Sequence, residues 1–235
     1  MVSKWEAMNR RVPWVAALAL PVIGAFLTWA VLFGLNLHER SQAQSLIAAV
    51  NSMHVGTSTI EEVRPLLASF HTYVAEPWIA KQYSADTGIY LGFGNRFMAR
   101  LGDRFYFLRY VGLAPWAANA EIYFRNNRIC ELRVALLLET KKIEGSRVGF
   151  ALSTRQSSAP ADGFVISGGH VTGGSRYVFY RVETITLPAD ATPEERAHAF
   201  GYDLSCVARL GGCQDLTQIL DLKAIGHDRD SRRPY

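Results

Sequence analysis

The three cysteines, Cys130, Cys206 and Cys213, are the residues whose chemistry is easiest to interpret. The last two flank a Gly-Gly pair, so the short segment between them can fold back on itself. In an oxidising compartment they would form a disulfide, which contributes roughly 2–3 kcal/mol in the chain-entropy model. The alternatives are two buried thiols, or a thiol used in catalysis or metal binding. We expect a Cys206–Cys213 disulfide and a buried, apolar role for Cys130.

Other reactive groups do not form a familiar site in the sequence. No two of the six histidines stand three or four residues apart. The spacing of His198, Cys206 and Cys213 matches no common zinc-finger pattern. The acid pairs at 61–62 and 194–195 fall in the first turns of expected helices, where the helix dipole accounts for them. We therefore predict no catalytic residue, no metal site and no cofactor.

A glycine-rich stretch at residues 168–175 lies between two segments that resemble strands. A phosphate-binding loop would need a strand–loop–helix context and a Gly-Lys-Ser/Thr ending, and neither is present. The stretch is expected to be a mobile hairpin loop. The alternative is a loop that binds a ligand or partner, since loops on a rigid sheet often carry binding. Its candidate contact residues are Gly168, Gly169, His170, Gly173 and Gly174.

The elements that position these residues follow one uncharged segment, Val12 to Leu37. As a helix it would reach about 39 Å at ~1.5 Å per residue, enough to cross a hydrocarbon layer of about 30 Å. We predict a single transmembrane helix at 12–37. A signal peptide cleaved near Ala43 is one alternative, although the run is much longer than the ~7–15 residues of a signal core. A buried helix of a soluble protein is the other.

The basic residues near this segment predict its orientation. Lys4, Arg10 and Arg11 precede it, whereas only Arg40 follows closely. The positive-inside rule then assigns residues 1–11 to the cytoplasm. It places an extracytoplasmic or periplasmic domain at 38–226 outside the inner membrane, followed by a flexible tail at 227–235. The net charge of +4 is not gathered into a basic stripe, so we expect no binding of nucleic acid.

Helical patterns occur at both ends of this domain. Apolar residues recur at helical spacing over residues 40–53, so that helix can continue directly from the anchor. A capping box at Ser58 begins a second helix, in which we expect a kink or restart at Pro65. Thr192 is the expected N-cap of a third helix that ends at Gly211-Gly212.

Between these helices the sequence predicts strands, which gives an α+β fold with an antiparallel sheet flanked by helices. The aromatic residues near position 106 are expected in the sheet. In the clearest hairpin, a three-residue loop at 125–127 would pair Ile122 with Cys130 and turn Glu131 towards water. The predicted strands are Thr87–Gly94, Arg104–Val111, Glu121–Arg125, Arg128–Leu138, Arg147–Ser153, Gly163–Ser167 and Arg176–Leu187.

Two stretches resemble known proteins. LIAAVNSMHVGTSTIEEVRPLLASF, followed by EIYFRNNRICELRVAL, is similar to the two-helix-on-sheet layout of BamE/SmpA-type envelope lipoproteins. That resemblance implies an assembly or scaffolding role. Those proteins begin with a lipid-carrying cysteine, whereas this chain has none before Cys130. LSCVARLGGCQDLTQIL resembles the C-terminal end of uncharacterised bacterial single-pass membrane-anchored proteins, and this resemblance supplies no activity.

The leading functional hypothesis is a membrane-anchored, non-catalytic accessory, scaffold or assembly subunit. It would contact the lipid bilayer through residues 12–37 and bind other membrane or envelope proteins through its sheet or loops. The alternative is a membrane-tethered extracytoplasmic enzyme, similar to a hydrolase, whose site cannot be read from the sequence.

Overall fold

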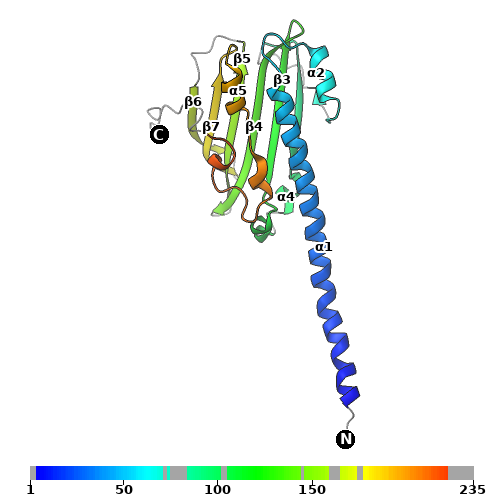
Figure 1. Ribbon diagram of the computed structural model, residues 1–235. Coiled ribbons are helices and arrows are strands. Elements are labelled where there is room, and N and C mark those ends of the chain that lie inside the picture. The colour runs from blue at the N-terminus through cyan, green and yellow to red at the C-terminus, as the bar shows by residue number, and fades with distance from the viewer. Residues whose placement is uncertain are drawn as a thin grey trace.

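A single long helix, α1 (Lys4–Asn51, 48 residues), runs from the N-terminal region onto one face of a sheet (Figure 1). The computed structural model describes residues 4–70, 73–74, 84–101, 105–143, 146–158, 165–173 and 177–221. The apolar segment and the amphipathic segment that follows it are therefore one continuous helix, as the sequence allowed. Among the described residues, α1 is the one helix long and apolar enough to cross a membrane, a property that signal sequences share.

The sheet has seven strands in the order β1-β2-β3-β4-β5-β7-β6. Neighbours are antiparallel except β5 and β7, which are parallel, so the expectation of a purely antiparallel sheet is wrong for that pair. β6 lies at the edge, and β7 returns antiparallel to it into the place beside β5. The bounds are β1 Tyr73–Val74, β2 Thr87–Gly94, β3 Trp116–Arg125, β4 Arg128–Ile143, β5 Ser146–Ser157, β6 Val165–Gly173 and β7 Tyr177–Leu187.

Helices from both ends of the domain cover the same face of this sheet, as Figure 1 shows for α1 and α5. The core lies between them, because the inward side of α1 and the matching side of β4 are both apolar. Leu46 and Val50 of α1 are buried with Leu132 and Leu136 of β4 in one hydrophobic cluster. The shorter helices are α2 Ile60–Leu67, α4 Arg96–Leu101, η1 Tyr106–Val111, α5 Pro193–Ala199, η2 Leu204–Ala208 and η3 Leu216–Gln218.

Local signals place the helix starts more accurately than the ends. Thr192 caps α5 in a capping box with Glu195, as predicted. The N-cap of α2 is Thr59, one residue after the predicted Ser58, and α2 continues through Pro65 to end at Leu67. α5 ends at Ala199 and does not reach Gly211. The reason is a second start signal, since the Asp203 side chain accepts a hydrogen bond from Ser205 N and begins η2.

The β3–β4 hairpin has a two-residue turn, and the predicted three-residue loop is wrong. Asn126 and Asn127 both have positive φ, 49° and 64°, which suits a tight hairpin turn. An irregularity after Tyr123 then shifts the register, so Ile122 pairs with Leu132. A bulge therefore achieves the apolar pairing that the longer loop was invoked to provide.

The expected strand at Arg104–Val111 is also wrong. From Tyr106 to Val111 the chain forms the 3-10 helix η1, which ends at Gly112 with φ 79°. Glycine adopts this left-handed conformation more readily than other residues. The segment therefore turns back towards α1 and does not join the sheet.

Candidate functional site

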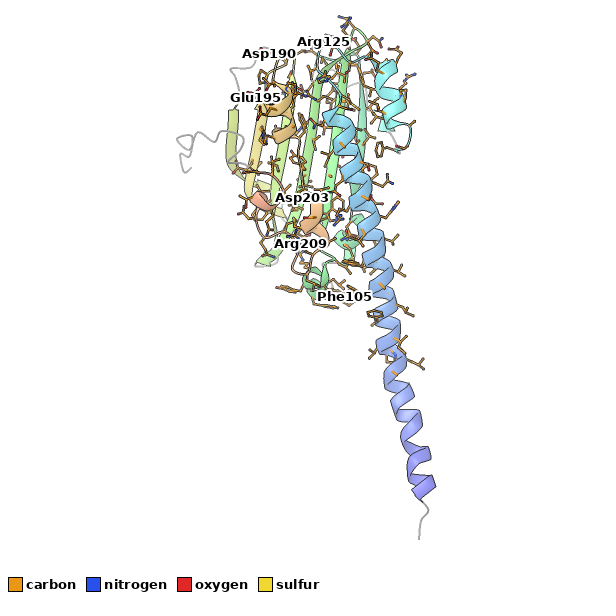
Figure 2. The ribbon with its side chains drawn as sticks, viewed as in Figure 1. Phe105, Arg125, Asp190, Glu195, Asp203 and Arg209 are labelled. Carbon is orange, nitrogen blue, oxygen red and sulfur yellow. A yellow bond between two sulfur atoms is a disulfide. The ribbon has the colours of Figure 1, made fainter. Side chains whose placement is uncertain are left out.

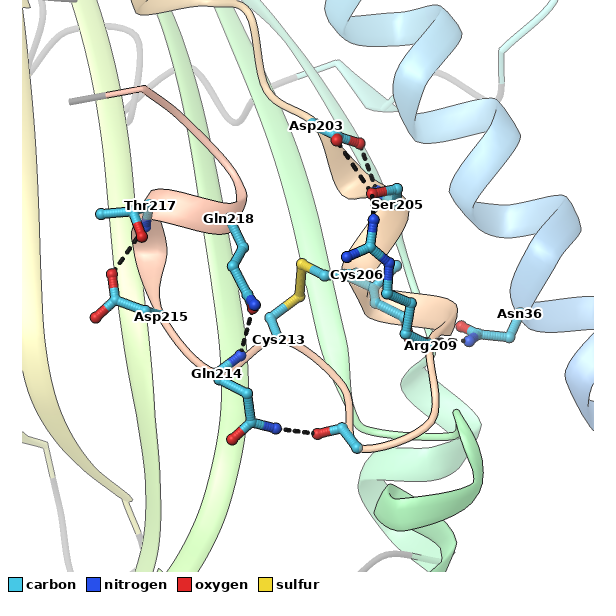
Figure 3. The surroundings of a disulfide bond; sticks show 12 residues. Asn36, Asp203, Ser205, Cys206, Arg209, Cys213, Gln214, Asp215, Thr217 and Gln218 are labelled. Carbon is cyan, nitrogen blue, oxygen red and sulfur yellow. Dashed lines mark hydrogen bonds between the residues drawn. A yellow bond between two sulfur atoms is a disulfide. The ribbon is translucent and has the colours of Figure 1, made fainter. Parts of the chain in front are cut away.

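The most elaborate polar cluster lies where α1 meets the domain, around the buried side chain of Asn36 (Figure 3). Its Oδ1 accepts a hydrogen bond from Trp116 Nε1 at 2.7 Å. Its Nδ2 donates to Gly112 O at 3.0 Å and to Val207 O at 3.3 Å. One amide thus joins α1 to β3, to the end of η1 and to η2. A buried amide with satisfied partners fixes the register of the helix against all three.

Contact between helix and domain begins earlier in the chain, at Trp29. Its Nε1 donates to Val111 O at 3.0 Å, and the side chain is half-buried. A Cβ added at Gly112 would lie 2.9 Å from the ring of Phe33, so this glycine permits close approach. Trp29 lies inside the predicted transmembrane span, yet its indole is bound by the chain's own domain. The last residues of the predicted span, up to Leu37, therefore lie beside protein.

The Cys206–Cys213 disulfide is present and closes the loop that follows η2 (Figure 3). Side-chain hydrogen bonds hold the same segment, with Gln214 N donating to Gln218 Oε1 at 2.7 Å. Val207 follows Cys206 directly in the chain. The disulfide therefore also holds Val207 O, which accepts the hydrogen bond from Asn36 Nδ2. The bond acts as a structural clamp at the junction.

Two buried arginines complete this framework. Arg109 of η1 forms an ion pair with Glu139 of β4, and both side chains are 5% exposed. Arg196 of α5 donates to Asn51 O and Met53 O at the C-terminal end of α1, and to Gln156 on β5. Burial lowers the pKa of Arg196. Each of these arginines binds groups distant in sequence, so periodicity gave no signal for either pairing.

The sheet face opposite α1 carries a different arrangement, here called the outer sheet face. Glu131 of β4 pairs with Arg155 of β5 at 2.8 Å, and Arg133 pairs with Glu121 at 3.7 Å. Burial raises the pKa of Glu131, and the bond from Arg155 opposes that effect. Glu131 was expected to face water but is 3% exposed. This face consists of the side chains of Asn119, Glu121, Glu131, Arg133, Ala135, Leu137, Ser153 and Arg155.

The predicted glycine-rich loop is largely strand. β6 continues to Gly173, with an irregularity in pairing after Gly169, so residues 168–173 do not form a hairpin loop. The segment pairs with β7 on both sides of this irregularity, and glycine in a strand often marks such a position. Gly174 and the side chain of His170 lie outside the described residues. The proposed binding role of this segment stays a prediction.

The contacts described above hold α1 and the domain in one arrangement. Within the described ranges, no group of three His, Cys, Asp or Glu residues could hold a metal ion. Cys130 is buried beside the β3–β4 bulge, and burial raises its thiol pKa. Comparison with family models, with curated proteins and with solved structures finds no match to this chain.

Proposed function

We propose that the protein is a single-pass membrane scaffold whose outer sheet face binds another envelope protein. In this proposal α1 stays in the inner membrane with its N-terminus in the cytoplasm, and the domain lies outside. The N-terminal part of residues 12–37 would then contact the bilayer, and the C-terminal part would contact the domain.

The observation that carries the proposal is the continuity of α1 from its exposed apolar part into the core. A domain on a flexible linker can turn freely relative to its anchor, whereas a helix that enters the core cannot. Hydrogen bonds from Trp29 and Asn36 to the domain, and from Arg196 to Asn51 O, hold this helix at three levels. Such coupling suits a protein that holds a surface at one height and orientation.

The same continuity supports a retained anchor over a cleaved leader. Ala43, near the candidate cleavage position, is completely buried within the helix. Cleavage there would also remove Asn36, whose partners Trp116, Gly112 and Val207 lie in the folded domain.

The outer sheet face provides the proposed contact surface. Its charged side chains are already paired with one another, so binding a partner need not reorder them. Leu137, at one end of this face, is 38% exposed, and Asn119 and Ala135 on the next row are partly exposed. Protein interfaces combine apolar contact area with polar groups at the rim, and this face offers both.

Photo-crosslinking in intact membranes tests this proposal. A photoactivatable amino acid would replace Leu137 or Asn119 on the outer sheet face, and Glu194 on exposed α5 as the matched control. We expect both sheet positions to give the same discrete protein adduct and position 194 to give none. Equal adducts at all three positions, or none at either sheet position, would contradict the proposed surface.

A further inference from the structure

Exposed apolar side chains gather at the end of the domain where α1 leaves it. Beyond Leu37, all the large exposed apolar residues of the described side chains lie there, apart from Leu66 and Leu137. The set, here called the collar, consists of Phe97, Phe105, Phe107, Tyr110 and Leu210. Figure 2 shows Phe105 and Arg209 at this end, whereas Asp190 and Glu195 lie at the far end of the domain.

The collar lies beside α1, next to its turns from Trp29 to Leu35. Phe105, Phe107 and Tyr110 belong to η1 and its start, and η1 contacts α1 through Val111 and Trp29. Leu210 is held beside η1 because Gly211 N donates to Tyr110 O at 3.1 Å. Phe97 of α4 lines a hollow of ≈ 370 Å³ together with Leu32 and Leu35 of α1.

The collar is too exposed for side chains that face only water. Phe107 is 61% exposed, Tyr110 62% and Leu210 75%. A contiguous exposed apolar group of this kind marks an interaction site for protein or membrane. Its neighbour α1 indicates which of the two.

The length of α1 gives the depth at which the collar lies. From Val12, just after Arg10 and Arg11, to Leu32 the helix rises about 30 Å at ~1.5 Å per residue. That equals the thickness of a typical hydrocarbon core, about 30 Å. The far boundary of the bilayer then falls at Leu32, between Trp29 and Phe33, where η1 contacts the helix.

We propose that the collar inserts into the interfacial layer of the same bilayer that α1 crosses. Tyr and Trp are enriched at this depth, and membrane-surface segments bury Phe and Leu side chains at the boundary between headgroups and acyl chains. The positively charged side chain of Arg209 is exposed at this end, next to Leu210, and suits anionic headgroups. The domain therefore rests on the membrane surface.

This inference rests on the proposed membrane anchor, so the test reports the two separately. Full-length protein with one added cysteine carries an environment-sensitive fluorophore in vesicles of phosphatidylcholine and phosphatidylglycerol. Lipids with a nitroxide near the headgroup or deep in the acyl chain act as quenchers. The labelled variants are Leu20→Cys in the anchor, Phe107→Cys and Leu210→Cys in the collar, and Asp190→Cys at the far end of the domain.

We expect the label at position 20 to be quenched by the deep nitroxide, and labels at 107 and 210 more strongly by the shallow one. The label at 190 should lose no fluorescence with either lipid. Quenching at 20 with none at 107 and 210 would overturn the collar proposal alone and leave its side chains for a protein partner. Loss of quenching at position 20 as well would overturn the anchor itself.

Discussion

The two halves of α1 differ in their surroundings. In the first half, Leu20 is 70% exposed and Phe26 62% exposed, and apolar residues lie all round the helix. In the second half, Leu46 is 1% exposed and Val50 is fully buried, while Ser45 on the other side is exposed. Polar residues from His38 onwards restrict the apolar groups to one face. One helix can therefore have a segment that is apolar all round and a segment with a single apolar face, without a break in its backbone hydrogen bonds.

The largest effect should come from charge in the first half. In Ile23→Arg with Leu27→Arg, each arginine costs about 2.5–3.5 kcal/mol at the centre of a membrane helix, so insertion should fail. Alkaline carbonate should then extract the protein from membranes. The matched pair Ser45→Arg with Ala48→Arg lies at exposed positions of the second half and should stay bound. Retention of both variants would remove the distinction between the halves.

A cavity in the second half should destabilise the domain and leave the anchor intact. Leu46→Ala should lower the free energy of unfolding by about 2–5 kcal/mol, because the side chain is buried in the core. Denaturant titration in detergent, followed by tryptophan fluorescence, measures this change. Ala48→Ser on the exposed side of the same turn should change it very little. Membrane retention should be unaffected in both, and a loss with Leu46→Ala would mean that folding controls insertion.

The disulfide lies beside the boundary between the two halves, and its loss should have an intermediate effect. Cys206→Ser with Cys213→Ser should lower the free energy of unfolding by about 2 kcal/mol, since the closed loop is short. The natural chain treated with dithiothreitol should show the same decrease, which the same titration would detect. Dithiothreitol should not change the double variant further. A second decrease there would show that the reductant acts elsewhere.

The smallest effect concerns the outer sheet face, far from the lipid-facing half. Burial raises the pKa of Glu131 above its ordinary value of 4.5. Just above pH 4.5, Glu131 is therefore protonated to a greater extent in the folded state than in the unfolded state. The free energy of unfolding then falls as the pH rises through this range. Glu131→Gln should remove this slope in unfolding titrations repeated across the window. Glu121→Gln, on the same face, should keep it.

The sequence predicted those features that depend on neighbouring residues. The capping box at Thr192, the change of apolar pattern after Leu37 and most strand segments are local, and the structure contains them. The fold class and the coverage of the sheet by helices from both ends follow from the same patterns. The disulfide was also predictable, because Cys206 and Cys213 are close in the chain.

Features set by distant partners were missed. η1 has the alternating aromatic residues of a strand, but its outward side chains are exposed and its end turns at Gly112. The bulge after Tyr123 depends on the match of two whole strands, which the turn sequence alone does not specify. Asn36 was included in the predicted transmembrane helix because its three hydrogen-bond partners lie far along the chain.

Arg196 has a consequence for the order in which the chain matures. Its guanidinium binds the carbonyls that end α1, yet it is synthesised long after that helix has emerged. During translation the apolar face around Leu46 and Val50 is therefore synthesised before the strands and before α5, which cover it in the folded domain. Contacts between such distant segments slow folding. The nascent domain should thus depend on shielding of this face until translation is nearly complete.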